Sequence, residues 1–249
     1  MRKPSSLVSL LAAAILVLLS PPALAGNDKT PPGNPCGDGP GVGKGNPCNG
    51  NNGNRGSNGN AGNGSNNGHD PEPFEIDRPG NDRGAFIVQI GEASTASISQ
   101  AAESQYALIV QAGPDNQADV SQTGNGAHYA AVGQLGWDNE LRLDQSGPSA
   151  QVALLTQEGG WNNMIVDQRG SSISNGVAAL QFGSGNDINL KQEGSDNQAL
   201  LVQVGSGNEM NVDQHGDNNQ LSWTQIGNDL SRHMVSQTGN QTMQIIQSR

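Results

Sequence analysis

The chain has 249 residues, of which 33% are hydrophobic, 3% aromatic and 14% charged, and 35 are glycine. This composition disfavours a large conventional core, because there is too little apolar side chain to fill one. The formal net charge of −11 argues against a nucleic-acid partner, since binding along a phosphate backbone requires a basic surface. A polar, repetitive and ordered architecture, or a low-complexity chain, remains.

Residues 1–25 have the pattern of a secretory signal peptide. Arg2 and Lys3 form a basic start, residues 7–19 are an apolar run, and the small residues up to Ala25 suit cleavage after that position. A membrane anchor is the alternative, but the run is shorter than the roughly 20 residues that a span requires. We therefore expect a secreted protein with no membrane insertion.

Residues 26–84 are rich in Gly, Asn and Pro and are predicted to be a disordered leader. The stretch 49–68 contains no apolar residue except Ala61, so it cannot bury enough surface to offset its chain entropy. The composition favours a spacer, and an address read by an export machine is the alternative. Cys36 and Cys48 lie in this leader, and in an oxidising compartment a disulfide is their expected use, since a metal site needs more ligands.

Glutamine recurs at intervals of 10 to 13 residues throughout the segment 85–249. An internal repeat of this kind decides the architecture before any other pattern. The fifteen repeat glutamines are Gln89, Gln100, Gln111, Gln122, Gln134, Gln145, Gln157, Gln168, Gln181, Gln192, Gln203, Gln214, Gln225, Gln237 and Gln247. A turn glycine stands two residues after thirteen of them: Gly91, Gly113, Gly124, Gly136, Gly147, Gly159, Gly170, Gly183, Gly194, Gly205, Gly216, Gly227 and Gly239.

Each repeat glutamine closes a short stretch of alternating apolar residues. The residue two positions before it is apolar in all fifteen cases, as Ile109 is before Gln111. Alternation of this kind predicts a strand with one face inward, and the glutamine shares that inward parity. An asparagine of the same parity stands five residues after seven of the glutamines: Asn116, Asn139, Asn162, Asn186, Asn197, Asn208 and Asn219.

A short strand and turn every 11 residues cannot be stable alone, so we expect the units to stack. Two strands form a coil of 22 or 23 residues, and about seven coils stack with like residues above like, at ~4.8 Å. The inward Gln and Asn side chains then form amide ladders, which avoids the ~1–3 kcal/mol cost of an unpaired buried amide. The predicted fold class is all-β, a β-solenoid, and the ladders are the candidate self-assembly residues.

The outward positions differ between alternate strands. Leu108 and Val110 make one sheet partly apolar outside, whereas Arg142 and Asp144 make the other sheet charged. We expect the apolar sheet to pack laterally on another protofilament or on a surface; ordinary exposed apolar side chains are the alternative.

Units such as 111–122 and 203–214 resemble the curlin repeat, in which Gln, Gly and Asn recur at these spacings. Curlins are the secreted subunits of curli, the amyloid fimbriae of bacterial biofilms. The resemblance covers 85–249 and implies export through an outer-membrane channel, a cell-surface location, and polymerisation with further copies and with a related nucleator or major subunit. Ser94 and Leu230 stand where the repeat has asparagine, in the first and last units.

An enzyme, a nucleator subunit and a monomeric binding module are the other functions that the sequence could indicate. We expect no enzyme, cofactor or metal, because His69, His128, His215 and His233 are scattered and no catalytic motif is present. The alternatives are a minor nucleator subunit and a monomeric β-solenoid adhesin or binding module. A capped solenoid ends in atypical segments, whereas strand-like sequence here reaches Ile245, which predicts an open edge.

Overall fold

The computed structural model describes residues 74–230 and 234–249. The predicted signal peptide, most of the predicted leader and the predicted Cys36–Cys48 disulfide lie outside these residues. The described residues contain fifteen strands and no helix, and so no helix that could cross a membrane. The strands are β1 (Gly84–Ile90), β2 (Thr95–Gln100), β3 (Tyr106–Ala112), β4 (Gln117–Thr123), β5 (Tyr129–Trp137), β6 (Glu140–Ser146), β7 (Gln151–Gly160), β8 (Asn163–Gly170), β9 (Asn175–Ser184), β10 (Asp187–Gly194), β11 (Gln198–Ser206), β12 (Glu209–His215), β13 (Gln220–Ile226), β14 (Met234–Gln237) and β15 (Thr242–Ser248).

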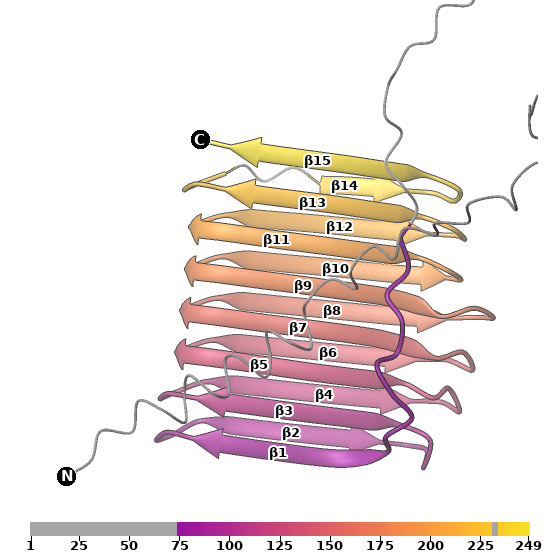
Figure 1. Ribbon diagram of the computed structural model, residues 1–249, viewed down its shortest axis with the longest axis horizontal. Helices are drawn as coiled ribbons and strands as arrows, with labels where there is room; N and C mark the ends of the chain where they lie inside the picture. Colours follow the sequence, from indigo (N-terminus) through magenta and orange to yellow (C-terminus); the bar gives the residue numbers. More distant parts are fainter. Residues whose placement is uncertain (1–73, 231–233) are drawn as a thin grey trace, which may run out of the picture. The chain divides into compact units, whose positions relative to one another are not determined.

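The strands form two parallel sheets that face each other. Sheet A contains the eight odd-numbered strands in chain order, and sheet B contains the seven even-numbered strands (Figure 1). Successive strands therefore lie in opposite sheets, and the chain winds as a β-solenoid with two strands per coil. Every described pair keeps the register that places glutamine on glutamine, as Gln111 on Gln134. The predicted β-solenoid of about seven coils is confirmed.

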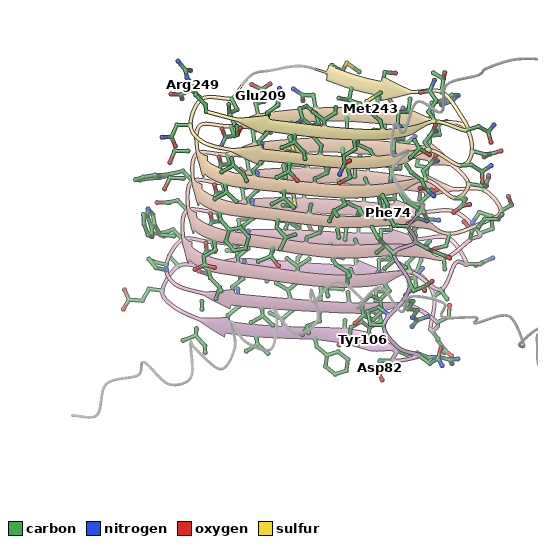
Figure 2. All side chains as sticks on the ribbon, turned by 45° about the horizontal axis from the view of Figure 1, so that its top comes forward. Phe74, Asp82, Tyr106, Glu209, Met243 and Arg249 are labelled. Carbon is green, nitrogen blue, oxygen red and sulfur yellow. The ribbon has the colours of Figure 1, made fainter. Side chains whose placement is uncertain are left out.

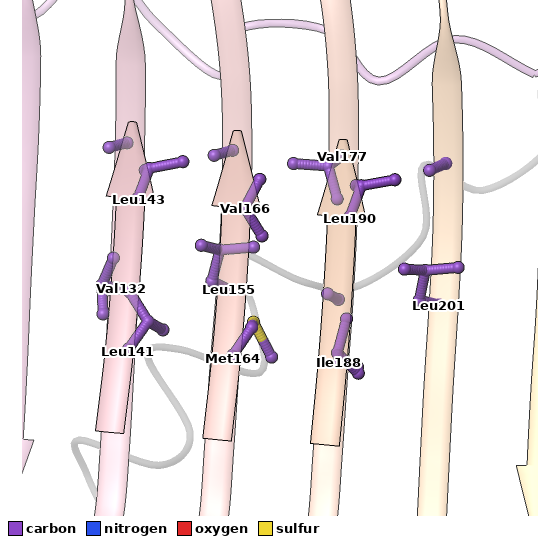
Figure 3. Packing of buried hydrophobic residues seen from close by; sticks show 14 of the residues in the cluster. Val132, Leu141, Leu143, Leu155, Met164, Val166, Val177, Ile188, Leu190 and Leu201 are labelled. Atoms are coloured by element: carbon purple, nitrogen blue, oxygen red, sulfur yellow. The ribbon is translucent and has the colours of Figure 1, made fainter. Parts of the chain in front are cut away.

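The core is the narrow space between the two sheets. It is filled by the apolar residues two and four positions before each glutamine, and 23 buried residues form one continuous cluster. Leu143, Val166 and Leu190 are register partners on successive strands of sheet B, and Figure 3 shows them repeating at the same level. Each coil thus buries its apolar residues against the next coil, so stacking supplies the core that a single coil lacks.

Several strands are longer than the five residues that the alternation predicts. β7 and β9 have ten residues each, because the parallel ladder continues past the glutamine into the turn. Gly159 pairs there with Gly183, and Gly160 pairs with Ser184. The turns are therefore stacked in register as the strands are.

Residues 74–83, which we name the strap, are an extended segment along the outer face of sheet A. Figure 1 shows it in purple, running across the strands towards β1. The backbone N–H of Phe74 donates to Gln220 Oε1 at 3.3 Å, and that of Ile76 donates to Gln198 Oε1 at 3.1 Å. Gly176 makes room for the strap, since a Cβ there would lie 2.7 Å from Ile76 Cβ.

The strap covers the first residues of several sheet A strands. Ile76 packs on a small apolar cluster that contains Tyr129 and Val152, which are 4% and 1% exposed. The Arg78 guanidinium carbon lies 5.7 Å from the centroid of the Tyr129 ring. The sequence predicts the strap as part of the leader, but its alternating side chains have the pattern of a segment packed on a surface. Lateral packing of sheet A stays a prediction.

Candidate assembly site: amide ladders and two open edges

The repeat glutamines of sheet A form one hydrogen-bonded column. Each Nε2 donates to Oε1 of the glutamine in the next coil; the Gln111–Gln134 distance is 2.6 Å and the Gln134–Gln157 distance is 2.8 Å. The column is Gln89, Gln111, Gln134, Gln157, Gln181, Gln203, Gln225 and Gln247. Sheet B has the matching column Gln100, Gln122, Gln145, Gln168, Gln192, Gln214 and Gln237.

The second amide hydrogen of these glutamines crosses the core. Gln111 Nε2 donates to the carbonyl oxygen of Thr95 at 3.0 Å, and Gln122 Nε2 donates to that of Tyr106 at 3.0 Å. Each acceptor is the first residue of the preceding strand, in the opposite sheet. Both hydrogens and the carbonyl oxygen of an interior glutamine are therefore used, so the hydrogen bonds offset the cost of burying Gln111 and Gln122 fully.

Both glutamine columns have the same direction. Every Nε2 within them points to the coil that follows in the sequence, so the amide dipoles add along the stack. At one end of the sheet A column, Gln89 Oε1 has no preceding glutamine; at the other end, Gln247 Nε2 has no following glutamine. The two ends of the stack therefore differ, one presenting an acceptor and the other a donor.

Asparagines form a third column in the turns that follow sheet A. Asn139 Nδ2 donates to Asn116 Oδ1 at 2.9 Å, and the backbone N–H of Asn139 donates to the same oxygen at 3.2 Å. The column is Asn116, Asn139, Asn162, Asn186 and Asn208.

The two departures from the repeat stand at the ends of this asparagine column. Ser94 Oγ accepts the backbone N–H of Asn116 at 3.1 Å and donates to the carbonyl oxygen of Gly113 at 2.9 Å. The backbone N–H of Leu230 donates to Asn208 Oδ1 at 3.0 Å, but the leucine side chain has no acceptor to offer. The asparagine ladder therefore stops at Leu230, whereas both glutamine columns continue to the last described coil.

The turns that follow sheet B contain a mixed column that the sequence predicts only in part. Asn219 Nδ2 donates to Asn197 Oδ1 at 2.9 Å, as expected. Gln105 stands five residues after Gln100 but is not an asparagine, and forward counting misses the positions of His128, Gln151 and Asn175; all four residues are fully buried. Counting six residues back from the next repeat glutamine finds every one of them, because insertions fall before this position and not after it.

His128 is the weakest member of this mixed column. Its Nε2 lies 2.9 Å from the carbonyl oxygen of Thr123, and its Nδ1 is buried with no hydrogen-bond partner in the described structure. Gln151 Oε1, from the adjoining coil, is also buried and unpaired within the described residues. Burial lowers the pKa of His128, outweighing the opposite effect of its bond to Thr123, so the imidazole is held neutral.

Twelve of the thirteen predicted turn glycines have a positive φ. At Gly136 the φ is +118°, and a Cβ would lie 1.9 Å from the carbonyl oxygen of Gly159 in the next coil. Glycine is thus required both by the turn and by the close approach of the layers. Gly170 differs from the other twelve, because it lacks a positive φ; there a Cβ would lie 1.7 Å from Gln151 Nε2, so the packed side chain of Gln151 favours glycine.

The stack has two open edges in its described part. β1 and β2 form one edge and β14 and β15 the other, each with a single neighbouring strand in its sheet. Ile87 and Met243 occupy inward positions, yet they are 44% and 36% exposed because no further coil covers them. Figure 2 shows Met243 near one end of the stack and Tyr106 near the other. Edges with free backbone groups and bare core residues are templates for another chain.

The outer face of sheet B carries pairs of opposite charge. Arg142 pairs with Asp144 at 2.9 Å and Lys191 pairs with Glu193 at 3.1 Å, in both cases two residues apart on one strand. The hydrogen bond from Lys191 lowers the pKa of Glu193. Such exposed pairs contribute little to stability. Across the described residues, no group of three or more His, Cys, Asp or Glu side chains is arranged to hold a metal ion.

Comparison with known proteins finds one family. Residues 80–124 and 183–216 match the family model of the curlin associated repeat. No curated protein matches the chain, and no solved structure matches it. The two matched stretches lie in coils near opposite ends of the stack, and the glutamine columns run through both and through the coils between them. These two stretches therefore carry the curlin associated repeat.

Proposed function

We propose that the protein is a secreted structural subunit that assembles into extracellular curli-like amyloid fimbriae for cell adhesion and the biofilm matrix. The observation that carries the proposal is the pair of open edges, where inward residues such as Ile87 and Met243 have no covering coil among the described residues. A further copy would bury these side chains and pair the free backbone groups of the edge strands. A monomeric solenoid module would instead end in capping segments that cover its edge strands.

The chemistry of the stack supports addition of like to like. A glutamine column gains the same hydrogen bonds from another copy as it has within the chain, at about 2.8 Å between coils. Identical stacked amides are the interior of cross-β fibres. Assembly therefore continues the fold and needs no new kind of contact.

The domain organisation proposed with this function has three parts. Residues 1–25 direct secretion, residues 26–84 lead the chain through an outer-membrane export channel, and residues 85–249 form the repeat domain. The strap belongs to the second part in sequence, but its contacts with Gln198 and Gln220 join it to the third.

Incubation of the purified chain 26–249 tests this function. We expect assembly with a lag phase and a cross-β reflection at ~4.7 Å, because each added copy must first meet an ordered edge. A chain that stays monomeric after prolonged incubation would support the capped adhesin instead. A chain that assembles poorly but seeds a related curlin at trace amounts would support the nucleator.

A further inference from the structure

The two sheets of the described stack are unequal, and this inequality bears on how copies join. Sheet A has eight strands and sheet B has seven, so β1 and β15, the first and last strands, both lie in sheet A. Each strand advances the stack by half a coil, since the cross-core bond of each glutamine reaches the strand before it, as from Gln122 in β4 to Tyr106 in β3. The described stack is thus seven and a half coils high.

Stacking a second copy with its sheet A on sheet A leaves a defect. In that arrangement β1 of the incoming copy pairs with β15 in sheet A. In sheet B, the strand position that follows β14 stays empty. β14 of the first copy and β2 of the incoming copy would face each other across a gap one strand wide. Their backbone N–H and C=O groups would be enclosed there without partners, which is strongly unfavourable.

We propose that successive copies join with a half-turn about the stack axis, so that β1 of the incoming copy pairs with β14 and β2 pairs with β15. Resting on the proposed function, this names the geometry of its junction. The strands of sheet A run opposite to those of sheet B (Figure 1). A half-turn exchanges the sheets and reverses each strand, so the new pairs remain parallel and no gap forms.

The half-turn also continues the glutamine columns. Gln237 of β14 then donates to Gln89 of the incoming copy, and Gln247 of β15 donates to its Gln100. In both pairs a donor at the C-terminal edge meets an acceptor at the N-terminal edge, which is the direction of every bond in the two columns. Joining two like edges would oppose donor to donor or acceptor to acceptor, so the polymer is polar.

Core residues match at the same junction. Val235 of β14 lies against Ile87 of the incoming copy, and Ile245 of β15 lies against its Ile98, because all four stand two residues before a repeat glutamine. Ile87 is 44% exposed without this layer. The half-turn therefore covers both edge strands at once.

Disulfide cross-linking in assembled fibres tests the junction. The outward residues next to the terminal glutamines are Val88, Ser99, Ser236 and Ile246. Each is changed singly to cysteine in a Cys36→Ser/Cys48→Ser chain, and pairs of variants are mixed, assembled and oxidised. Register partners ~4.8 Å apart on adjacent parallel strands are within the Cα range of a disulfide.

The half-turn predicts covalent dimers from Ile246→Cys mixed with Ser99→Cys and from Ser236→Cys mixed with Val88→Cys. It predicts at least tenfold less dimer from Ile246→Cys mixed with Val88→Cys, the pair that same-sheet stacking would join. Dimers mainly from this last mixture, or equal yields from all three, would overturn the half-turn and leave the fibre proposal standing. Absence of fibres from the unmodified chain would overturn the proposed function itself.

Unmodified fibres give a second readout should the cysteine variants not assemble. The half-turn predicts a rise of about 36 Å per copy and an identical view only every second copy, at about 72 Å, from coils ~4.8 Å apart. Electron microscopy that finds identical copies at every subunit step, with no half-turn between them, would overturn the inference.

Discussion

The side chain of a buried glutamine in this protein makes hydrogen bonds to three partners. Two are the glutamines before and after it in its own sheet, and the third is a backbone carbonyl of the opposite sheet. Gln157 accepts from Gln134, donates to Gln181 at 2.9 Å and donates to the carbonyl oxygen of Glu140 at 3.0 Å. Amides joined in this way are polarised by their neighbours, and the column acts as a unit. A single residue in it therefore affects coils on both sides.

Replacement of Gln157 by Ala should destabilise the stack by about 3 kcal/mol, because it leaves buried groups of Gln134 and Gln181 without partners. The urea concentration at which the assembled protein dissolves measures this loss. Gln117→Ala is the matched control, since the side chain of Gln117 is exposed on β4. Equal midpoints for the two variants would show that the column does not stabilise the fold.

His128 makes stability depend on pH. Its pKa in the folded chain is below the ordinary 6.5, because burial disfavours the charged ring. The unfolded chain therefore binds the proton more tightly. The contribution of neutral His128 to the free energy of unfolding should be fully present above about pH 6.5. It should be lost as the pH drops from there towards the lower folded pKa.

Substitution of His128 by Asn should flatten this pH dependence, because asparagine holds the same column position in later coils and does not titrate. Urea midpoints at several pH values below about 6.5 compare the two chains. His215→Asn is the control, since that ring is exposed on β12. A slope unchanged by His128→Asn would contradict a role for this imidazole.

At the scale of the elements, the strap and sheet A depend on each other. Backbone N–H groups of the strap donate hydrogen bonds to the side-chain oxygens of Gln198 and Gln220, and Ile76 covers the first residues of several strands. These first residues are outward-facing, and on an uncovered sheet they would be exposed. The strap therefore occupies part of the face for which lateral packing is predicted.

Ile76→Asp should release the strap while leaving the coils intact, because a charge cannot pack on the apolar cluster of Tyr129 and Val152. Hydrogen exchange across residues 74–83 should then become faster, and exchange in β5 and β7 should change little. Glu75→Ala is the control, since Glu75 is exposed. Equal exchange of residues 74–83 in the two variants would show that Ile76 does not hold the strap on sheet A.

On the scale of the whole molecule, assembly depends on the residues of the last coils. Gln237→Ala should slow fibre elongation about tenfold, because the C-terminal edge then loses one of its two column donors. Ser99→Ala, an outward change in β2, should leave the rate nearly unchanged. Fluorescence of an amyloid dye during seeded growth measures both rates. Similar rates would exclude the amide columns from the growing edge.

The amino-acid sequence by itself determines the winding of this chain. The intervals between glutamines, the alternating apolar positions and the glycines after each strand are local features, and a strand with a turn every 11 residues has one way to bury its inward face. For the same reason, the glutamine columns and the asparagine column that follows sheet A, from Asn116 to Asn208, are predictable one repeat at a time.

The tertiary structure alone decided what depends on contacts between distant residues. The strap meets Gln198 and Gln220 more than 100 residues away. The direction of the amide columns depends on which neighbouring coil each amide donates to. His128, Gln151 and Gly170 take their roles from the coils stacked beside them. A repeat specifies its own shape, but the bonds between repeats depend on the stack as a whole.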